Sequence, residues 1–272
     1  MIRHPLACAA ADILGEDVTD CTSLHGGDLS DVVRIVTAGG RSLIAKSGPD
    51  PVAEGAMLEA MRAAGASAPQ PVAMGAEVLL MEDLGPAGRT SEASWRDLGE
   101  SLSRMHGATA ERYGWDRDYA FGPVVIRNRW SVDWPDFWIE RRLLADADLL
   151  PPDIVEGLHN LRPRIAVALP DAPSASLLHG DLWTGNVHFD GQGKAWLIDP
   201  ACYHGHGEVD LAMLTLFGSP PRAFWEAYGP LPDGWERRRA IYQLWPALVH
   251  LRLFGGGYRP LVERLMGQVA SG

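Results

Sequence analysis

The residues best suited to chemistry lie in one short stretch of the C-terminal half. Residues 177–186 read LLHGDLWTGN, which has the spacing H-x-D-x-x-x-x-N and contains Asp181 and Asn186. A strand–turn–strand pattern follows and ends in Asp199. Phosphoryl transfer needs such groups close together, because a carboxylate must accept the proton of the attacking hydroxyl and oxygen ligands must hold Mg²⁺ against a triphosphate. We therefore expect Asp181 to be the catalytic base, and Asn186 and Asp199 to be metal ligands.

Each part of this pattern alone is weak evidence, since a single Asp in a turn is more often a cap or turn residue. The whole string with its downstream Asp is specific. It is similar to the catalytic and metal loops of the protein-kinase-like superfamily, and His-Gly-Asp in place of His-Arg-Asp resembles the small-molecule branch, which includes aminoglycoside and choline kinases. This resemblance implies ATP and Mg²⁺ as cofactors.

Three residues near the motif have expected supporting roles. His179 is expected to be a buried structural histidine that bonds backbone near the metal loop. Asp210 lies near the start of a predicted helix, and we expect it to accept N–H bonds from the catalytic loop. Trp183 is a candidate substrate residue, because an indole face offers apolar area and cation–π attraction to an ammonium group. A plain core tryptophan is the alternative.

The elements that must position a nucleotide precede this motif. A glycine turn over residues 24–30 is followed by strand-like segments at 32–36 and 42–46. Glycine lets backbone N–H groups approach phosphate, so Gly26 and Gly27 are candidate nucleotide-binding residues. The turn is neither a full GxGxxG nor a Walker A motif.

A lysine and a glutamate complete the expected phosphate-binding set. Lys46 ends the second strand, where the lysine of the superfamily reaches the α- and β-phosphates. Glu54 lies on the helix predicted over residues 52–64 and is the expected ion-pair partner of Lys46. Glu59, on the same helix, is the alternative partner.

The change in pattern along the chain predicts the fold. An apolar strand at 77–81 is broken at Glu82 and Leu84, where a hinge should present backbone groups to adenine. The chain beyond is mainly helical. We therefore predict an α+β, protein-kinase-like bilobal fold, with a small β-rich N-lobe (1–84) and a larger, mainly helical C-lobe (85–272).

Longer strings resemble one family within this branch, the fructosamine kinases (ketosamine-3-kinases). Residues 179–186 are similar to its HGDLWxGN motif, and residues 198–213 resemble its IDPAxYxGxxExDLAM string. Further matches lie at 113–118, 128–143 and 253–258. The resemblance implies transfer of the ATP γ-phosphate to the 3-hydroxyl of a ketosamine, an adduct formed by glycation of an amine, and hence deglycation. Some members carry cysteine where Asp28 stands, so we expect no redox-sensitive disulfide here; Asp28 is the second candidate substrate residue.

Composition limits the partners. The formal net charge of −11 over 272 residues argues against nucleic acid. No apolar run approaches the ~20 residues that cross a bilayer, so no membrane partner is expected. Three cysteines without a CxxC pair favour the reducing cytoplasm. We expect a small-molecule or protein-bound ketosamine as substrate, and a monomer or weak dimer.

Two other functions stay open. The first is another small-molecule kinase of this fold, acting on an aminoglycoside, choline, homoserine or a methylthio-sugar; Trp183 and the string after Asp199 argue against it. The second is a non-catalytic nucleotide-binding relative, which is disfavoured because Lys46, Asp181 and Asn186 are all present. The sugar and the amine of the acceptor are undetermined.

Overall fold

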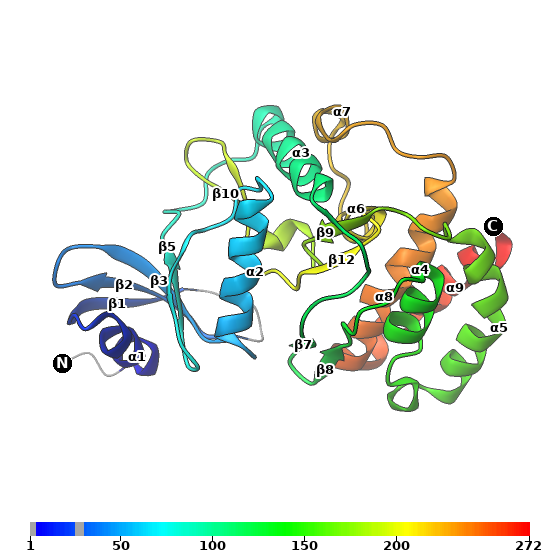
Figure 1. The fold of residues 1–272 in the computed structure, drawn as a ribbon, viewed down its shortest axis with the longest axis horizontal. Coiled ribbons are helices and arrows are strands. Elements are labelled where there is room, and N and C mark those ends of the chain that lie inside the picture. Colours follow the sequence, from blue (N-terminus) through cyan, green and yellow to red (C-terminus); the bar gives the residue numbers. More distant parts are fainter. Residues whose placement is uncertain (1–3, 25–29) are drawn as a thin grey trace.

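The computed structural model describes residues 4–24 and 30–272 of the chain. A small sheet with two flanking helices is followed by a larger, mainly helical part (Figure 1). The predicted α+β arrangement, with the β-rich part first, is therefore confirmed. The lobe boundary after residue 84 stays a prediction.

The N-terminal sheet has five antiparallel strands in the order β1–β2–β3–β5–β4. Their bounds are β1 Val18–Leu24, β2 Val32–Thr37, β3 Ser42–Lys46, β4 Pro71–Met74 and β5 Leu79–Glu82. Alternate residues of β2, Val33 and Ile35, are buried on the face that helix α1 (Pro5–Leu14) covers. Because β3 lies at the centre of the sheet, its last residue, Lys46, is held by a strand on each side.

Helix α2 (Pro51–Ala63) packs against strands β4 and β5, on the side of the sheet that is nearer the helical part (Figure 1). Its apolar residues Met57, Leu58 and Met61 are fully buried. A Cβ atom at Gly55 would lie 2.8 Å from the Met74 sulfur, so glycine allows α2 to approach β4 closely. This packing fixes the orientation of helix α2 relative to the sheet.

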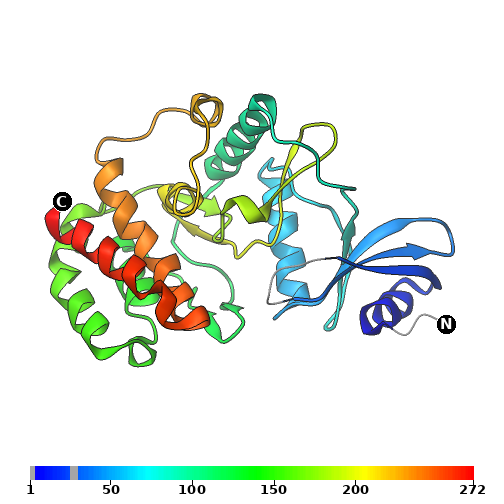
Figure 2. The same cartoon turned by 180° about the vertical axis from the view of Figure 1, so that it is seen from behind.

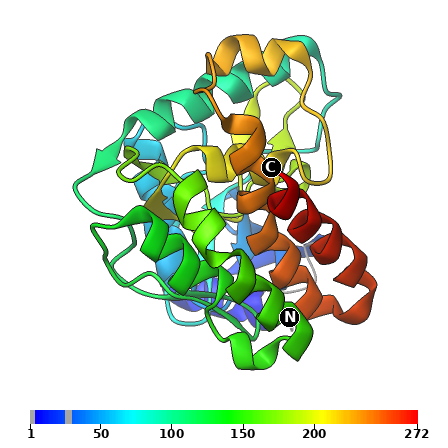
Figure 3. The same cartoon turned by 90° about the vertical axis from the view of Figure 1, so that its right-hand side faces the viewer.

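The helical part is built from seven α-helices among the described residues. They are α3 Glu92–Gly107, α4 Trp134–Trp138, α5 Pro152–Ala168, α6 Glu208–Leu214, α7 Arg222–Tyr228, α8 Trp235–Phe254 and α9 Arg259–Ser271. Figures 2 and 3 show α8 and α9 packed side by side, and α5 contacts α9. Within the ranges the structure describes, none of the helices combines the length and apolarity needed to span a membrane.

Short strands carry the functional loops through the helical part. They are β6 Thr109–Ala110, β7 Tyr119–Phe121, β8 Val124–Ile126, β9 Ala175–Leu178, β10 Val187–Phe189, β11 Ala195–Leu197 and β12 Tyr203–Gly205. β9 pairs with β12 and β6, and β10 forms a hairpin with β11. The 179–186 motif therefore leaves β9 and enters β10, and the segment at 198–202 leaves β11 and enters β12. Both loops start from paired strands and lie side by side.

Candidate active site

A glycine brings the two loops into contact. Gly180 has φ +81°, and a Cβ atom at this position would lie 2.0 Å from the Ala201 carbonyl oxygen. The Ala201 N–H donates to the His179 carbonyl at 2.8 Å. Only a residue without a side chain fits this left-handed, close approach, so Gly180 sets the position of Asp181.

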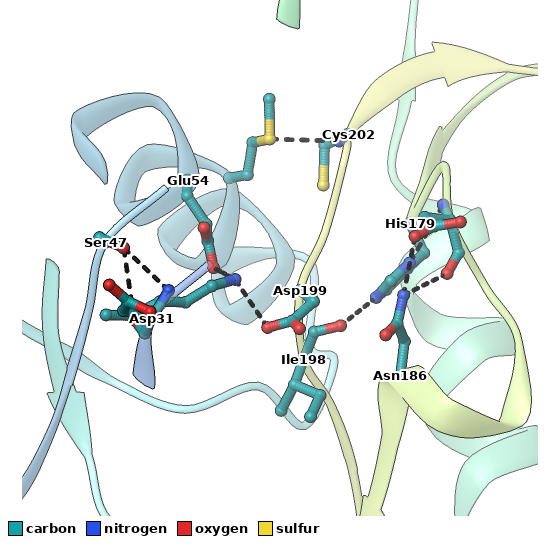
Figure 4. A network of polar contacts seen from close by, with 11 residues as sticks. Asp31, Ser47, Glu54, His179, Asn186, Ile198, Asp199 and Cys202 are labelled. Atoms are coloured by element: carbon teal, nitrogen blue, oxygen red, sulfur yellow. Dashed lines mark hydrogen bonds and ion pairs between the residues drawn. The ribbon is translucent and has the colours of Figure 1, made fainter. Parts of the chain in front are cut away.

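Asp181 and Asn186 form the centre of the site. The Asn186 amide nitrogen donates to Oδ2 of Asp181 at 2.9 Å and to its carbonyl oxygen at 2.8 Å. Figure 4 shows the amide oxygen of Asn186 on the side that faces Asp199. The two hydrogen bonds that the amide nitrogen donates thus orient the Asn186 side chain, and its oxygen is turned towards Asp199, the second predicted metal ligand.

The Asp181 carboxyl titrates near neutrality. Burial raises its pKa from 3.8 to about 7; the hydrogen bond from Asn186 opposes this rise, while the negative charges of Asp199 and Asp210 add to it. A carboxyl group with a pKa near the working pH is well matched to proton acceptance from a hydroxyl. The positive charge of Lys46 opposes the effect of these two carboxylates.

Lys46 joins the sheet to the metal loop. Its Nζ atom lies 2.7 Å from Glu54 Oε1 and 2.8 Å from Asp199 Oδ1. Burial opposes the charge of Lys46, but the two carboxylates outweigh burial and raise its pKa, so the ammonium stays charged. The structure places Glu54 at this ion pair, whereas Glu59 is exposed on α2. Figure 4 shows Asp199 between Glu54 and Asn186.

Asp199 has an unusual backbone. Its φ of 56° is one of two positive values among the described non-glycine residues. Such a conformation costs free energy and occurs mainly where surrounding contacts impose it, often at functional sites. The side chain is 38% exposed, so the carboxylate reaches both Lys46 and the cavity.

His179 and Asp210 make the contacts expected of them. The Nε2 atom of His179 donates to the Ile198 carbonyl at 2.9 Å, and burial lowers the pKa of this histidine, which keeps it neutral. Asp210 accepts from the His179 and Gly180 N–H groups at 2.7 and 3.0 Å. The sequence did not indicate a third partner of Asp210, His106 at the end of α3, whose Nε2 lies 3.1 Å away.

A cavity of about 310 Å³ connects these groups. Lys46, Asp181, Asn186 and Asp199 all line it, together with Trp183. Trp183 is 40% exposed, and its ring lies over Gly185, where a Cβ atom would come within 2.3 Å. Trp183 is therefore a partly exposed wall of the cavity, and the alternative of a plain core tryptophan is wrong.

The sequence did not identify most of the cavity wall. β7 contributes Tyr119 and Phe121, and α8 contributes Trp245, His250 and Phe254. No spacing pattern relates these two segments, which lie more than a hundred residues apart. The family strings at 113–118 and 253–258 flank them and were the available signal.

The described part of the cavity wall does not test the remaining predicted residues. Gly26, Gly27 and Asp28 are outside the described residues, although Ser30, which follows them, lines the cavity. Glu82 ends β5, and Leu84 lies just beyond it; neither is among the cavity-lining residues. Their roles towards phosphate, substrate and adenine stay predictions.

The donor set fits a magnesium nucleotide. Magnesium prefers oxygen ligands and is often held by one or two carboxylates plus substrate phosphates. Asp199 and Asn186 offer a carboxylate and an amide oxygen, and Lys46 offers a charged donor in the same cavity. Within residues 4–24 and 30–272, no three His, Cys, Asp or Glu side chains form a metal-binding cluster. The two oxygen ligands would thus be completed by phosphates and water.

Comparisons with known proteins all point to one family. The fructosamine kinase family model matches residues 7–271. A probable ketoamine kinase of Synechocystis sp. is 36% identical over 234 residues, which are 79% of this chain and 77% of that protein. The chloroplastic protein-ribulosamine 3-kinase of Arabidopsis thaliana is 35% identical over 196 residues, which are 68% of this chain and 59% of that protein.

Solved structures agree with this result. A Thermobifida fusca protein, assigned as a fructosamine-3-kinase, has a TM-score of 0.89 at 29% identity and covers 98% of this chain and 99% of its own. An aminoglycoside phosphotransferase has a TM-score of 0.62 at 15% identity, with 98% and 97% covered, and confirms the predicted protein-kinase-like fold. The chain therefore belongs to the fructosamine kinase family.

Proposed function

We propose that this protein transfers the γ-phosphoryl group of ATP, with Mg²⁺, to the 3-hydroxyl of a ketosamine, and so starts deglycation. Family membership and relatives named as ketoamine, ribulosamine and fructosamine kinases support the acceptor class. The observation that carries the proposal is the meeting of Lys46, Asp181, Asn186 and Asp199 in one cavity. These four groups arrive from the sheet and from two separate loops.

Each group has a role that its geometry supports. Asp181 orients the acceptor hydroxyl and accepts its proton, for which a pKa of about 7 is suitable. Asn186 and Asp199 would hold Mg²⁺, which supplies positive charge against the phosphate oxygens. Lys46, kept charged by Glu54, binds phosphate oxygens. Catalysis here is positioning and charge compensation, because phosphoryl transfer needs little else from the protein.

Trp183 is the proposed sugar or amine contact. Its ring is partly exposed, borders the cavity that contains Asp181, and is fixed by packing over Gly185. The amine of a ketosamine is a cation at neutral pH, and an indole face attracts such a cation by about 0.5–2 kcal/mol. This residue therefore favours a cationic acceptor beside the catalytic carboxylate.

The cellular location and the oligomeric state of the enzyme are also part of the proposal. We place the enzyme in the cytoplasm, because three cysteines without a paired motif suit a reducing compartment. A monomer or a weak dimer stays the expected state. Sedimentation at micromolar concentration measures it directly.

ATP consumption with a panel of acceptors tests the proposal. The panel contains fructosyl- and ribulosyl-lysine, an aminoglycoside and choline, each with Mg²⁺ and with a chelator. We expect Mg²⁺-dependent turnover on the ketosamines alone, reduced at least 100-fold in Asp181→Asn. Turnover on the aminoglycoside or choline alone would contradict the acceptor class, and equal rates for Asp181→Asn would contradict the role of that carboxylate.

A further inference from the structure

A group of partly exposed aromatic rings lies at the edge of the cavity. We define the aromatic rim as Phe217, His250, Phe254 and Tyr258. The ring centroid of His250 lies 5.1 Å from that of Phe217, 5.5 Å from that of Phe254 and 4.9 Å from that of Tyr258. His250 and Phe254 line the cavity that contains Asp181. The rim is therefore continuous with the site of phosphoryl transfer.

Two rings of the aromatic rim are exposed to solvent, unlike rings that serve only to pack the core. Phe217 is 46% exposed and Phe254 is 48% exposed; for comparison, Trp183 on the cavity wall is 40% exposed. Single exposed apolar residues are common, but contiguous exposed rings beside a cavity mark a binding surface. Burial of the exposed part of such a ring by an apolar group of a ligand would stabilise the complex. The surface is thus suited to an apolar group.

Charge on the cavity wall is confined to the catalytic centre. Among the described lining residues, the side chains charged at neutral pH are Lys46, Asp181, Asp199 and Asp210. Lys46 is held by two carboxylates, and Asp210 is occupied by backbone N–H groups. The described part of the wall therefore has no free cationic group near the rim that could pair with a carboxylate of the ligand.

His250 does not add a charge to the rim. Its Nδ1 atom donates to the Pro246 carbonyl at 2.7 Å, because a carbonyl can only accept. Burial lowers the pKa of His250 below its usual value, which favours the neutral imidazole at pH 7. The ring therefore behaves as an aromatic surface. A carboxylate placed against it would lose hydration without gaining a cationic partner.

We propose that the aromatic rim binds the substituent on the amine of the acceptor and selects an uncharged aliphatic or aromatic group over one with a carboxylate. This inference rests on the proposed ketosamine kinase function and specifies its acceptor. A glycated lysine with blocked α-amino and α-carboxyl groups presents a four-carbon chain and neutral amides to the rim. The same lysine as a free amino acid presents a carboxylate that has no cationic partner at the rim.

A matched series of fructosamines tests this. All members share the 1-deoxyfructosyl group and differ in the amine, which is methylamine, hexylamine, benzylamine, glycine, free lysine (through its ε-amine) or lysine blocked at both ends. We expect kcat/KM for the hexylamine, benzylamine and blocked-lysine adducts to exceed that for the glycine and free-lysine adducts at least tenfold, mainly through KM.

Variants assign the preference to the rim. Phe254→Ala and Phe217→Ala should each reduce the ratio of kcat/KM between the hexylamine and methylamine adducts several-fold, and Phe254→Leu should keep most of it. Val167→Ala, at an 88% exposed position on α5 outside the cavity, is the control and should not change the ratio. Thermal unfolding of each variant monitors folding.

The outcomes separate the two claims. An unchanged ratio in folded Phe254→Ala and Phe217→Ala, or a wild-type preference for the glycine or free-lysine adduct, overturns the rim while leaving ketosamine kinase activity in place. No turnover on any adduct, including the methylamine adduct that does not need the rim, overturns the proposed function and the rim together.

Discussion

The Nζ atom of Lys46 lies 2.8 Å from Oδ1 of Asp199, although 153 residues separate them along the chain. This ion pair joins the last residue of a central strand to the proposed metal loop. The positive charge of the lysine compensates the negative charge of this carboxylate. Because Glu54 also binds Lys46, the ammonium keeps one buried partner when Asp199 is engaged elsewhere.

The partner of Lys46 can be tested with two glutamates of the same helix. Glu54→Gln weakens a buried, charge-assisted hydrogen bond worth about 1.5–3 kcal/mol, so kcat/KM for ATP should fall roughly 10–100-fold. Glu59→Gln alters an exposed residue and should leave it unchanged. Steady-state kinetics at varied ATP measure both. A similar loss in the two variants, or none in Glu54→Gln, would contradict the assigned pair.

The ionised Asp181 carboxyl should make the protein less stable above neutral pH. Its pKa is about 7 in the folded state and near 3.8 when unfolded, so the folded state binds this proton more tightly. The associated stability is complete below about pH 4 and is lost as pH rises through 7. Asp181→Asn removes this dependence.

Urea unfolding without nucleotide or metal measures this effect. The free energy of unfolding of Asp181→Asn relative to wild type should increase by roughly 2–3 kcal/mol between pH 5 and pH 8. Comparison of the two proteins at each pH cancels the titration of other groups. A difference that is independent of pH would show that the folded and unfolded pKa values of Asp181 are equal.

Gly180 should be far less tolerant of substitution than a nearby glycine. Gly180→Ala would place a Cβ atom 2.0 Å from a carbonyl oxygen in a left-handed conformation, so we expect a loss of about 3 kcal/mol or more in unfolding free energy and loss of activity. Gly191→Ala, whose Cβ atom would meet nothing within 4 Å, is the control. Denaturation midpoints test both; equal midpoints would contradict the close contact of the two loops.

The sequence predicted the part of the site that local spacing determines. Asp181 and Asn186 are five residues apart in one loop, and a short hairpin carries Asp199 back to them, so their proximity follows from chain geometry. Lys46 and Glu54 were also identified, because the superfamily that the motif resembles has a lysine at the end of this strand and a glutamate on the helix that follows. The strands at 32–36 and 42–46 are confirmed, and the helix predicted over 52–64 is observed within one residue of these bounds.

The sequence did not predict contacts made only by tertiary packing. His106 reaches Asp210 from a helix 104 residues earlier, and its sequence position shows only the end of an amphipathic helix. Tyr119 and His250 meet at the cavity because the β7–β8 hairpin packs near the end of α8 (Figure 1). The β1 and β4 strands were also missed, since neither has the alternation of a half-buried strand.

Identification of the reaction product shows which hydroxyl of the ketosamine receives the phosphate. The protein, ATP and Mg²⁺ are incubated with an N-substituted fructosamine, and ³¹P and ¹H NMR follow the reaction. We expect a new phosphate ester coupled to the proton on sugar carbon 3, followed by release of the free amine, with neither signal in Asp181→Asn. A phosphate ester at another position, or a phosphorylated adduct that keeps its amine, would contradict the proposed reaction.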